Sequence, residues 1–136
     1  MSEPNELPTP VPESLEPGDT TKLMIAAHAA ADRKALDIVA IDIRAIATFS
    51  EYFLICSGTS TRQVQAIVDE IIDRLRTELD IRPVNNEGYE TGSWILLDYG
   101  DLIVHAFTEE SRRFYQLERL WRDAERVALP EELSKL

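Results

Sequence analysis

The sequence is poor in the residues that build disulfides, metal sites and membrane spans. Its single cysteine, Cys56, cannot form an internal disulfide, which agrees with a reducing compartment. The two histidines, His28 and His105, have no second histidine or cysteine at ligand spacing. No apolar run reaches the roughly 18 residues that a membrane span needs. The first residues lack the positive charge and apolar stretch of a secretory signal, so we expect a cytosolic protein with no membrane contact.

Positive charge is also scarce, since 14 Lys and Arg face 25 Asp and Glu. The net charge of −11 and the sequence pI of about 4.6 describe a surface that repels phosphate backbones. Direct binding of DNA, or of any nucleic acid through overall charge, is therefore disfavoured, and a basic protein partner is favoured. The alternative is that the acidity serves only solubility.

The chain divides into a tail, one domain and a short extension. Residues 1–18 hold five of the seven prolines and four glutamates but no Lys or Arg, which predicts a disordered tail. Residues 19–129 suit one domain with a single core, and 130–136 form a C-terminal extension.

Hydrophobic periodicity predicts the elements of this domain. A helix should follow Asp19 and run to about Lys34, a second should span 62–80 behind a Ser60–Gln63 capping box, and a third should follow Thr108 and end by 129. The third helix should turn Phe114, Leu117, Leu120, Trp121 and Ala124 inward. Strands are expected at 37–43, 52–57, 94–98 and 102–107, the last two forming a hairpin around Gly100. The order α-β-β-α-β-β-α predicts a single α/β domain with a mixed sheet flanked by helices.

Few residues point to catalysis. Asp98 and Asp101 flank a turn and Asp37 and Asp42 bracket a strand, where aspartates usually cap the backbone. His105 is expected to be a satisfied, half-buried side chain and Cys56 a small core residue, with a Cys56–His105 pair on neighbouring strands as the alternative.

The junction Gly58–Thr61 is the strongest candidate for a ligand site, because amides at a helix start can hold phosphate. It has neither the lysine nor the glycines of a P-loop. Nucleotidyltransferases follow a comparable Gly-Ser with an Asp-x-Asp or Asp-x-Glu pair on a strand, and here the helix 62–80 follows instead. A capped helix start is therefore favoured over a nucleotide site.

Aromatic residues concentrate in the last third of the chain, where they could form a contact surface or fill the core. This set comprises Tyr89, Trp94, Tyr99, Phe107, Tyr115 and Trp121.

Three blocks of the sequence resemble the ribosomal silencing factor family, also called the Iojap family. The blocks are Ala31–Ile38 with Ile41–Ile43, then Tyr52–Ser60 with Arg62–Val64 and Ala66–Ile67, and finally Glu87–Gly88, Trp94–Asp101, Val104–His105, Arg112, Tyr115, Leu117–Glu118 and Leu120–Trp121. Together they cover about residues 20–125 in the family's order. The chain departs from the family at Ser50-Glu51, where Thr-Asp is usual, and in its Pro/Glu tail.

The resemblance implies a protein without catalytic activity or cofactor whose fold is nucleotidyltransferase-like but lacks the catalytic carboxylates. It implies docking on ribosomal protein L-fourteen of the large subunit, which blocks association with the small subunit and represses translation. Free members are often homodimers, and a plastid host would place the protein in the stroma. The alternatives are a large-subunit assembly factor and a nucleotide-binding enzyme using Gly58–Thr61.

The resemblance also implies the residues that contact the partner. By family position these are Trp94, Ile95 and Leu97. We add Glu87, Asp98 and Glu110 as acidic groups suited to a basic ribosomal protein.

Overall fold

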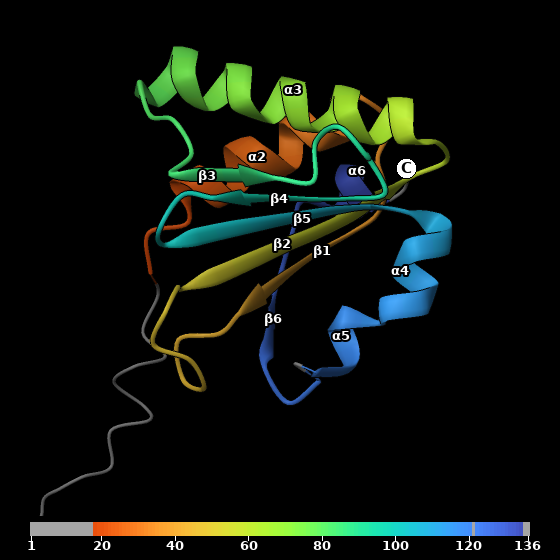
Figure 1. Ribbon diagram of the computed structural model, residues 1–136. Helices are drawn as coiled ribbons and strands as arrows, with labels where there is room; N and C mark the ends of the chain where they lie inside the picture. The colour runs from red at the N-terminus through yellow and green to blue at the C-terminus, as the bar shows by residue number, and fades with distance from the viewer. Residues whose placement is uncertain (1–17, 121, 135–136) are drawn as a thin grey trace, which may run out of the picture.

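The computed structural model describes residues 18–120 and 122–134 as one mixed sheet with helices on both faces (Figure 1). The sheet contains β1 (Leu36–Asp42), β2 (Tyr52–Gly58), β3 (Asn85–Glu87), β4 (Trp94–Asp98), β5 (Leu102–Thr108) and β6 (Glu125–Val127). The helices are α2 (Thr21–Asp32), α3 (Thr61–Leu79), α4 (Glu109–Tyr115), α5 (Leu117–Leu120) and α6 (Glu131–Ser134). The predicted tail lies outside the described residues, except for Gly18.

The strand order is β3-β4-β5-β2-β1-β6, in which β2 and β5 run parallel and the other neighbours are antiparallel. The predicted mixed sheet and the hairpin between β4 and β5 are confirmed, with Gly100 at φ 89° in the turn. Only glycine adopts such a conformation without strain.

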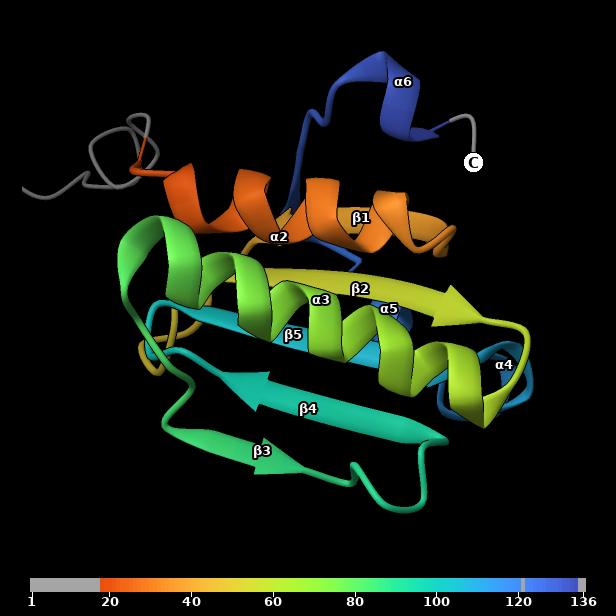
Figure 2. The same ribbon diagram turned by 90° about the horizontal axis from the view of Figure 1, so that it is seen from above.

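Helices α2 and α3 lie side by side across one face of the sheet (Figures 1 and 2). Helix α3 is built as its sequence predicts, with Ser60 Oγ accepting from the Gln63 amide at 3.1 Å. The Gln63 side chain accepts from the Thr59 amide at 2.7 Å and donates to the carbonyls of Arg33 and Lys34. The cap therefore also ties α3 to the end of α2.

The core on this face lies between the two helices and the inward side of the sheet. Alanines give α2 a flat surface, so it packs closely against the strands. The helix-side core includes Ala26, Ala30, Leu54, Val64, Ile67, Ile71, Ile95, Leu97 and Val104. Leu133 of α6 is 5% exposed within the same core, so residues after 129 also contribute to it.

The C-terminal part of the chain differs from the prediction of one helix from Thr108 to residue 129. Helix α4 ends at Tyr115, because the next residue, Gln116, has a left-handed φ of 48°. The chain then continues through α5 into the edge strand β6. Phe114, predicted to point inward, is 79% exposed. Leu117 and Ala124 do pack inward, on the face of the sheet opposite α2 and α3.

Candidate partner-binding face

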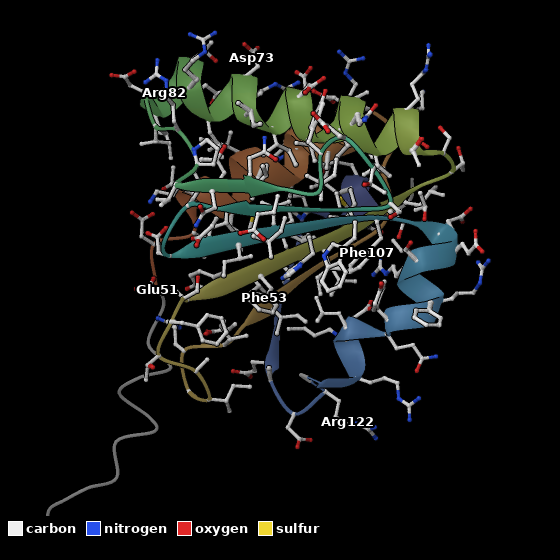
Figure 3. The ribbon with its side chains drawn as sticks, in the orientation of Figure 1. Glu51, Phe53, Asp73, Arg82, Phe107 and Arg122 are labelled. Atoms are coloured by element: carbon white, nitrogen blue, oxygen red, sulfur yellow. The ribbon has the colours of Figure 1, made fainter. Side chains whose placement is uncertain are left out.

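The face of the sheet opposite α2 and α3 is only partly covered. Helices α4 and α5 lie beneath one end of it, as Figure 1 shows. A second apolar cluster occupies this face and consists of Ile41, Ile43, Phe53, Ile55, Ile103, Phe107 and Leu117. Figure 3 shows Phe53 and Phe107 projecting on this side, away from α3. We call this side of the sheet the open face.

Partly and fully exposed apolar side chains border the second cluster. Trp94 and Leu96 of β4 are half-buried against it, and Tyr115 of α4 is 50% exposed. Phe49, in the loop before β2, is 58% exposed, and its ring lies 6.2 Å from that of Phe53. An apolar, aromatic surface of this kind is typical of a protein–protein contact site.

Strand β4 divides the predicted contact residues between the two faces. Ile95 and Leu97 have no exposed side-chain surface and belong to the helix-side core. Their assignment as contact residues does not fit this burial, because side chains alternate along a strand and only the other set faces outward. Trp94, Leu96 and Asp98 form that outward set, so Trp94 and Leu96 are the apolar side chains that β4 presents on the open face.

The acidic residues predicted for the contact lie at two places. Glu87 and Asp98 are on the open face, because Glu87 is paired with Leu96 and Asp98 with Asn85 across the β3–β4 ladder. Asp98 Oδ1 also accepts from the Gly100 amide at 2.8 Å, so it caps the turn. Glu110 is exposed in the first turn of α4, which begins where β5 ends opposite Trp94.

A buried histidine lies beneath the aromatic side chains. His105 is 4% exposed, and its Nδ1 accepts from Trp94 Nε1 at 3.1 Å. The neutral ring therefore carries its proton on Nε2, which has no hydrogen-bond partner among the described residues. Burial lowers the pKa of His105 from 6.5 to about 4. The prediction of a satisfied, half-buried histidine is thus wrong, since the ring is fully buried and only one nitrogen is bonded.

Arg112 holds α4 and α5 against the sheet. Its guanidinium donates to the Asp37 carbonyl at 2.7 Å and to Ser57 Oγ at 2.8 Å, and it pairs with Glu118 at 2.5 Å. The Arg112 side chain is only 11% exposed. Desolvation by burial acts to raise the pKa of Glu118, but the hydrogen bonds and charge of the Arg112 guanidinium outweigh it, so the pKa of Glu118 is lowered. No prediction from the residues alone identified this role.

The candidate catalytic groups are engaged in structural contacts or lie apart. Cys56 is paired with Ala106 and belongs to the helix-side core, whereas His105 is on the open face, so the alternative of a Cys56–His105 pair is wrong. Burial raises the pKa of the Cys56 thiol to about 12. Among residues 18–120 and 122–134, no three His, Cys, Asp or Glu side chains could together hold a metal ion.

The Gly58–Thr61 junction has little room for a phosphate group. The side chains of Ser60 and Gln63 already take up the amides of Gln63 and Thr59. Gly92 also packs against Thr61, where an added Cβ would lie 2.9 Å from the Thr61 Cβ. The geometry fits the capped helix start that the sequence favours.

None of the helices in the described part of the chain has the length and apolar character to cross a membrane.

Comparison with known proteins places this chain in a family. The family model described as "Ribosomal silencing factor during starvation" matches residues 17–136. The chain is 46% identical over 102 residues to the ribosomal silencing factor of Bacillus subtilis, covering 75% of this chain and 86% of that protein.

Two further similarities extend the comparison. A crystal structure of a Bacillus halodurans protein superposes with a TM-score of 0.71 at 39% identity, covering 82% of this chain and 100% of the other. The mouse protein named "Mitochondrial assembly of ribosomal large subunit protein 1" is 34% identical over 90 residues, which are 64% of this chain and 39% of that protein. Because the family model matches residues 17–136 and the Bacillus subtilis relative is 46% identical, this chain belongs to the ribosomal silencing factor family.

Proposed function

We propose that the chain represses translation by docking on the large ribosomal subunit, at ribosomal protein L-fourteen, where it blocks association with the small subunit. The proposal rests on the open face of this chain, together with its membership of the family. On that face Trp94, Leu96 and Tyr115 form an aromatic and apolar surface. Glu87 and Asp98 lie beside it. Such a surface suits a partner that combines an apolar patch with basic residues, as ribosomal proteins do.

The mode of action that this surface supports is steric. A bound domain occupies area that the opposing subunit would otherwise contact, and this requires neither a cofactor nor a reaction. The groups that could perform chemistry are engaged in caps, ion pairs or the core. Regulation would therefore follow the amount of protein and its affinity for the subunit.

A subunit-association experiment tests the proposal. Purified large and small subunits are mixed with and without the protein and separated on a sucrose gradient. We expect the protein to travel with the large subunit and to shift joined ribosomes toward free subunits. Joined ribosomes at the level seen without the protein, although it is bound, would contradict the blocking role.

Two variants locate the contact on the open face. Tyr115→Ala and Phe49→Ala each remove an exposed aromatic side chain, so they should weaken subunit binding with little effect on folding. Val84→Ala is the matched control, because Val84 is 74% exposed just before β3 and belongs to neither apolar cluster. Equal affinity of all three variants would place the contact elsewhere.

A second candidate is an assembly factor for the large subunit, which the name of the mouse relative favours. The two functions differ in the particle that is bound. Quantifying the protein on immature and mature large subunits from growing cells separates them, because an assembly factor is enriched on immature particles and depleted from mature ones.

The enzyme alternative makes a different prediction. The sequence after Gly58 is the helix α3, so no strand supplies the carboxylate pair that a nucleotidyltransferase uses to bind metal. We expect no turnover of nucleoside triphosphates with Mg²⁺. Turnover that disappears in Ser60→Ala would support catalysis instead.

A further inference from the structure

In the described part of this acidic protein, several arginines that form no ion pair lie near the C-terminal end of the chain. Elsewhere, most Lys and Arg side chains form ion pairs, as in Lys22–Asp101, Arg44–Asp42 and Arg74–Glu70. Within the described parts of the chain, four arginines close together in sequence form none. They are Arg113, Arg119, Arg122 and Arg126.

Three of these arginines line one hollow between α5 and β6, with a volume of about 450 Å³. The hollow is lined by Ile41, Glu118, Arg119, Arg122, Ala124 and Arg126. Ile41 and Ala124 belong to the second apolar cluster, so the hollow adjoins the open face. In Figure 3, Arg122 lies on the side of the sheet opposite Asp73 and Arg82 of the α3 side.

Among the described residues that line the hollow, Glu118 is the one carboxylate, and it already has a cationic partner. Glu118 accepts from both Nε and Nη2 of Arg112, and the charge of Arg126 adds a weaker attraction. Arg119 Nη1 donates to Gln116 Oε1 at 2.6 Å, a neutral acceptor, so the positive charges of Arg119, Arg122 and Arg126 can still attract another anion. Asp123 and Glu125 are exposed nearby, but neither forms an ion pair with these arginines. The hollow is therefore a local region of positive charge.

Phosphate is the anion that this arrangement suits. Arginine presents its donors in a planar fork that matches phosphate oxygens, and several such forks around one hollow can contact successive phosphates. The acidic remainder of the protein weakens this attraction only within a Debye length of about 8 Å at physiological salt. The overall charge of −11 therefore does not exclude a local phosphate contact.

We propose that Arg119, Arg122 and Arg126 bind the phosphate backbone of ribosomal RNA next to the protein surface on which the open face docks. This inference rests on the proposed binding to the large subunit, which is rich in RNA. The open face would then contact ribosomal protein, and the arginine-lined hollow would contact ribosomal RNA. The net charge of −11 disfavours contact with nucleic acid over most of the surface, and this local contact would be an exception.

The salt dependence of subunit binding tests the proposal. Each phosphate contact adds about one to the slope of log affinity against log salt concentration. We therefore expect the triple variant Arg119→Gln/Arg122→Gln/Arg126→Gln to bind the large subunit more weakly, with a slope reduced by about two to three. The control is Arg62→Gln/Arg76→Gln/Arg82→Gln, which makes the same change in net charge near α3, on the other side of the sheet. It should keep the slope of the unmodified chain.

A second experiment identifies the phosphate source directly. The full chain is titrated at low salt with a short RNA duplex while the NMR signals of the arginine Nε–H groups are followed. Those of Arg119, Arg122 and Arg126 should shift, and those of Arg62, Arg76 and Arg82 should not. A slope change on subunits without these shifts would indicate an acidic protein segment in the hollow and would overturn the RNA assignment.

The outcomes separate this inference from the proposed function. Equal slopes for the two triple variants, with subunit binding intact, would overturn the RNA contact alone. Failure of the unmodified chain to bind the large subunit would overturn both. Melting temperatures of both variants are measured alongside, so that a folding defect is not mistaken for lost binding.

Discussion

His105 and Trp94 show how one pair of side chains can serve both the core and the open face. The indole N–H of Trp94 satisfies one nitrogen of a buried imidazole, and the Trp94 ring lies 4.9 Å from that of Phe107 and 4.7 Å from that of Tyr115. The partly exposed Tyr115 is thus held by a ring that is itself bonded to the core. This arrangement fixes the geometry of the aromatic surface before any partner arrives, which reduces the entropy lost on binding.

The buried imidazole predicts a loss of stability in mild acid. The folded protein holds His105 neutral down to a pH of about 4, whereas the unfolded chain takes up its proton near 6.5. Between these values the unfolded state binds more protons, so the free energy of unfolding should fall as pH decreases. The part due to His105 is at most about 3 kcal/mol.

Urea unfolding across this pH range checks the effect. His105→Gln keeps an acceptor for Trp94 Nε1 but does not titrate, so its stability should depend less on pH than that of the unmodified chain. Identical pH profiles for the two proteins would show that His105 does not contribute.

Truncation of Trp94 should affect both folding and binding, because its side chain is half-buried and not simply exposed. We expect Trp94→Ala to reduce the free energy of unfolding by about 2–4 kcal/mol and to weaken subunit binding by a further factor of at least about thirty. Trp94→Phe preserves an aromatic ring but loses the N–H, and should cost about 1 kcal/mol of stability. Denaturant unfolding and subunit affinity are measured on the same preparations. Unchanged affinity in folded Trp94→Ala would remove Trp94 from the contact.

At the scale of elements, the ion pair of Arg112 with Glu118 positions the small helices that bound the open face. Arg112→Leu would leave Glu118 and Ser57 without their partner and should lower stability by about 2 kcal/mol. Arg112→Lys should recover little, because an ammonium cannot reproduce the forked contact.

The neighbouring residue supplies the control for this prediction. Arg113 is exposed and forms no ion pair with any residue that the structure describes, so Arg113→Leu should leave stability nearly unchanged. The melting temperatures of Arg112→Leu, Arg112→Lys and Arg113→Leu, measured by thermal unfolding, test this prediction. Equal melting temperatures for Arg112→Leu and Arg113→Leu would mean that the Arg112 contacts do not hold α4 and α5 in place.

Elements with strong local signals could be predicted from the sequence, and those that depend on tertiary contacts could not. Helix α3 has both a capping pair and a continuous apolar stripe, so its bounds follow closely from its residues. The strands β3 and β6 have three residues each and no alternation that marks them. Strand β3 forms because β4 offers it backbone hydrogen-bond partners, and β6 forms because β1 does. The left-handed Gln116 ends α4, which allows the chain to reach the β1 edge of the sheet.

The candidate site could be predicted only in part, for a related reason. Period two along β4 already separates Trp94 and Leu96 from Ile95 and Leu97. Both sets are apolar, however, so the sequence does not indicate which set faces the helices. That choice follows from the packing of α2 and α3 against Ile95 and Leu97. The arginine hollow was not predicted, since it brings Ile41 of β1 next to residues far away in the sequence.

At the scale of the whole molecule, charge is distributed unevenly over the two sides of the sheet. The α3 side has a surface of paired charges, including Arg74 with Glu70 and Arg76 with Asp73. The opposite side combines the aromatic surface of the open face with the unpaired arginines of the hollow. A paired surface is well solvated and attracts few partners, so the asymmetry favours docking through the open face.

The N-terminal segment should be dispensable for both folding and docking. Residues 1–17 include five prolines and four glutamates but no Lys or Arg, and both apolar clusters are assembled from residues after 22. Removal of residues 1–17 should therefore change the free energy of unfolding by less than about 0.5 kcal/mol and leave large-subunit binding intact. Gly18 is retained, because its backbone hydrogen-bonds to Tyr52. Thermal unfolding and co-sedimentation with large subunits test the two parts separately. A markedly lower melting temperature would show that the segment packs on the domain, whereas lost binding by a stable truncated chain would make the segment part of the contact.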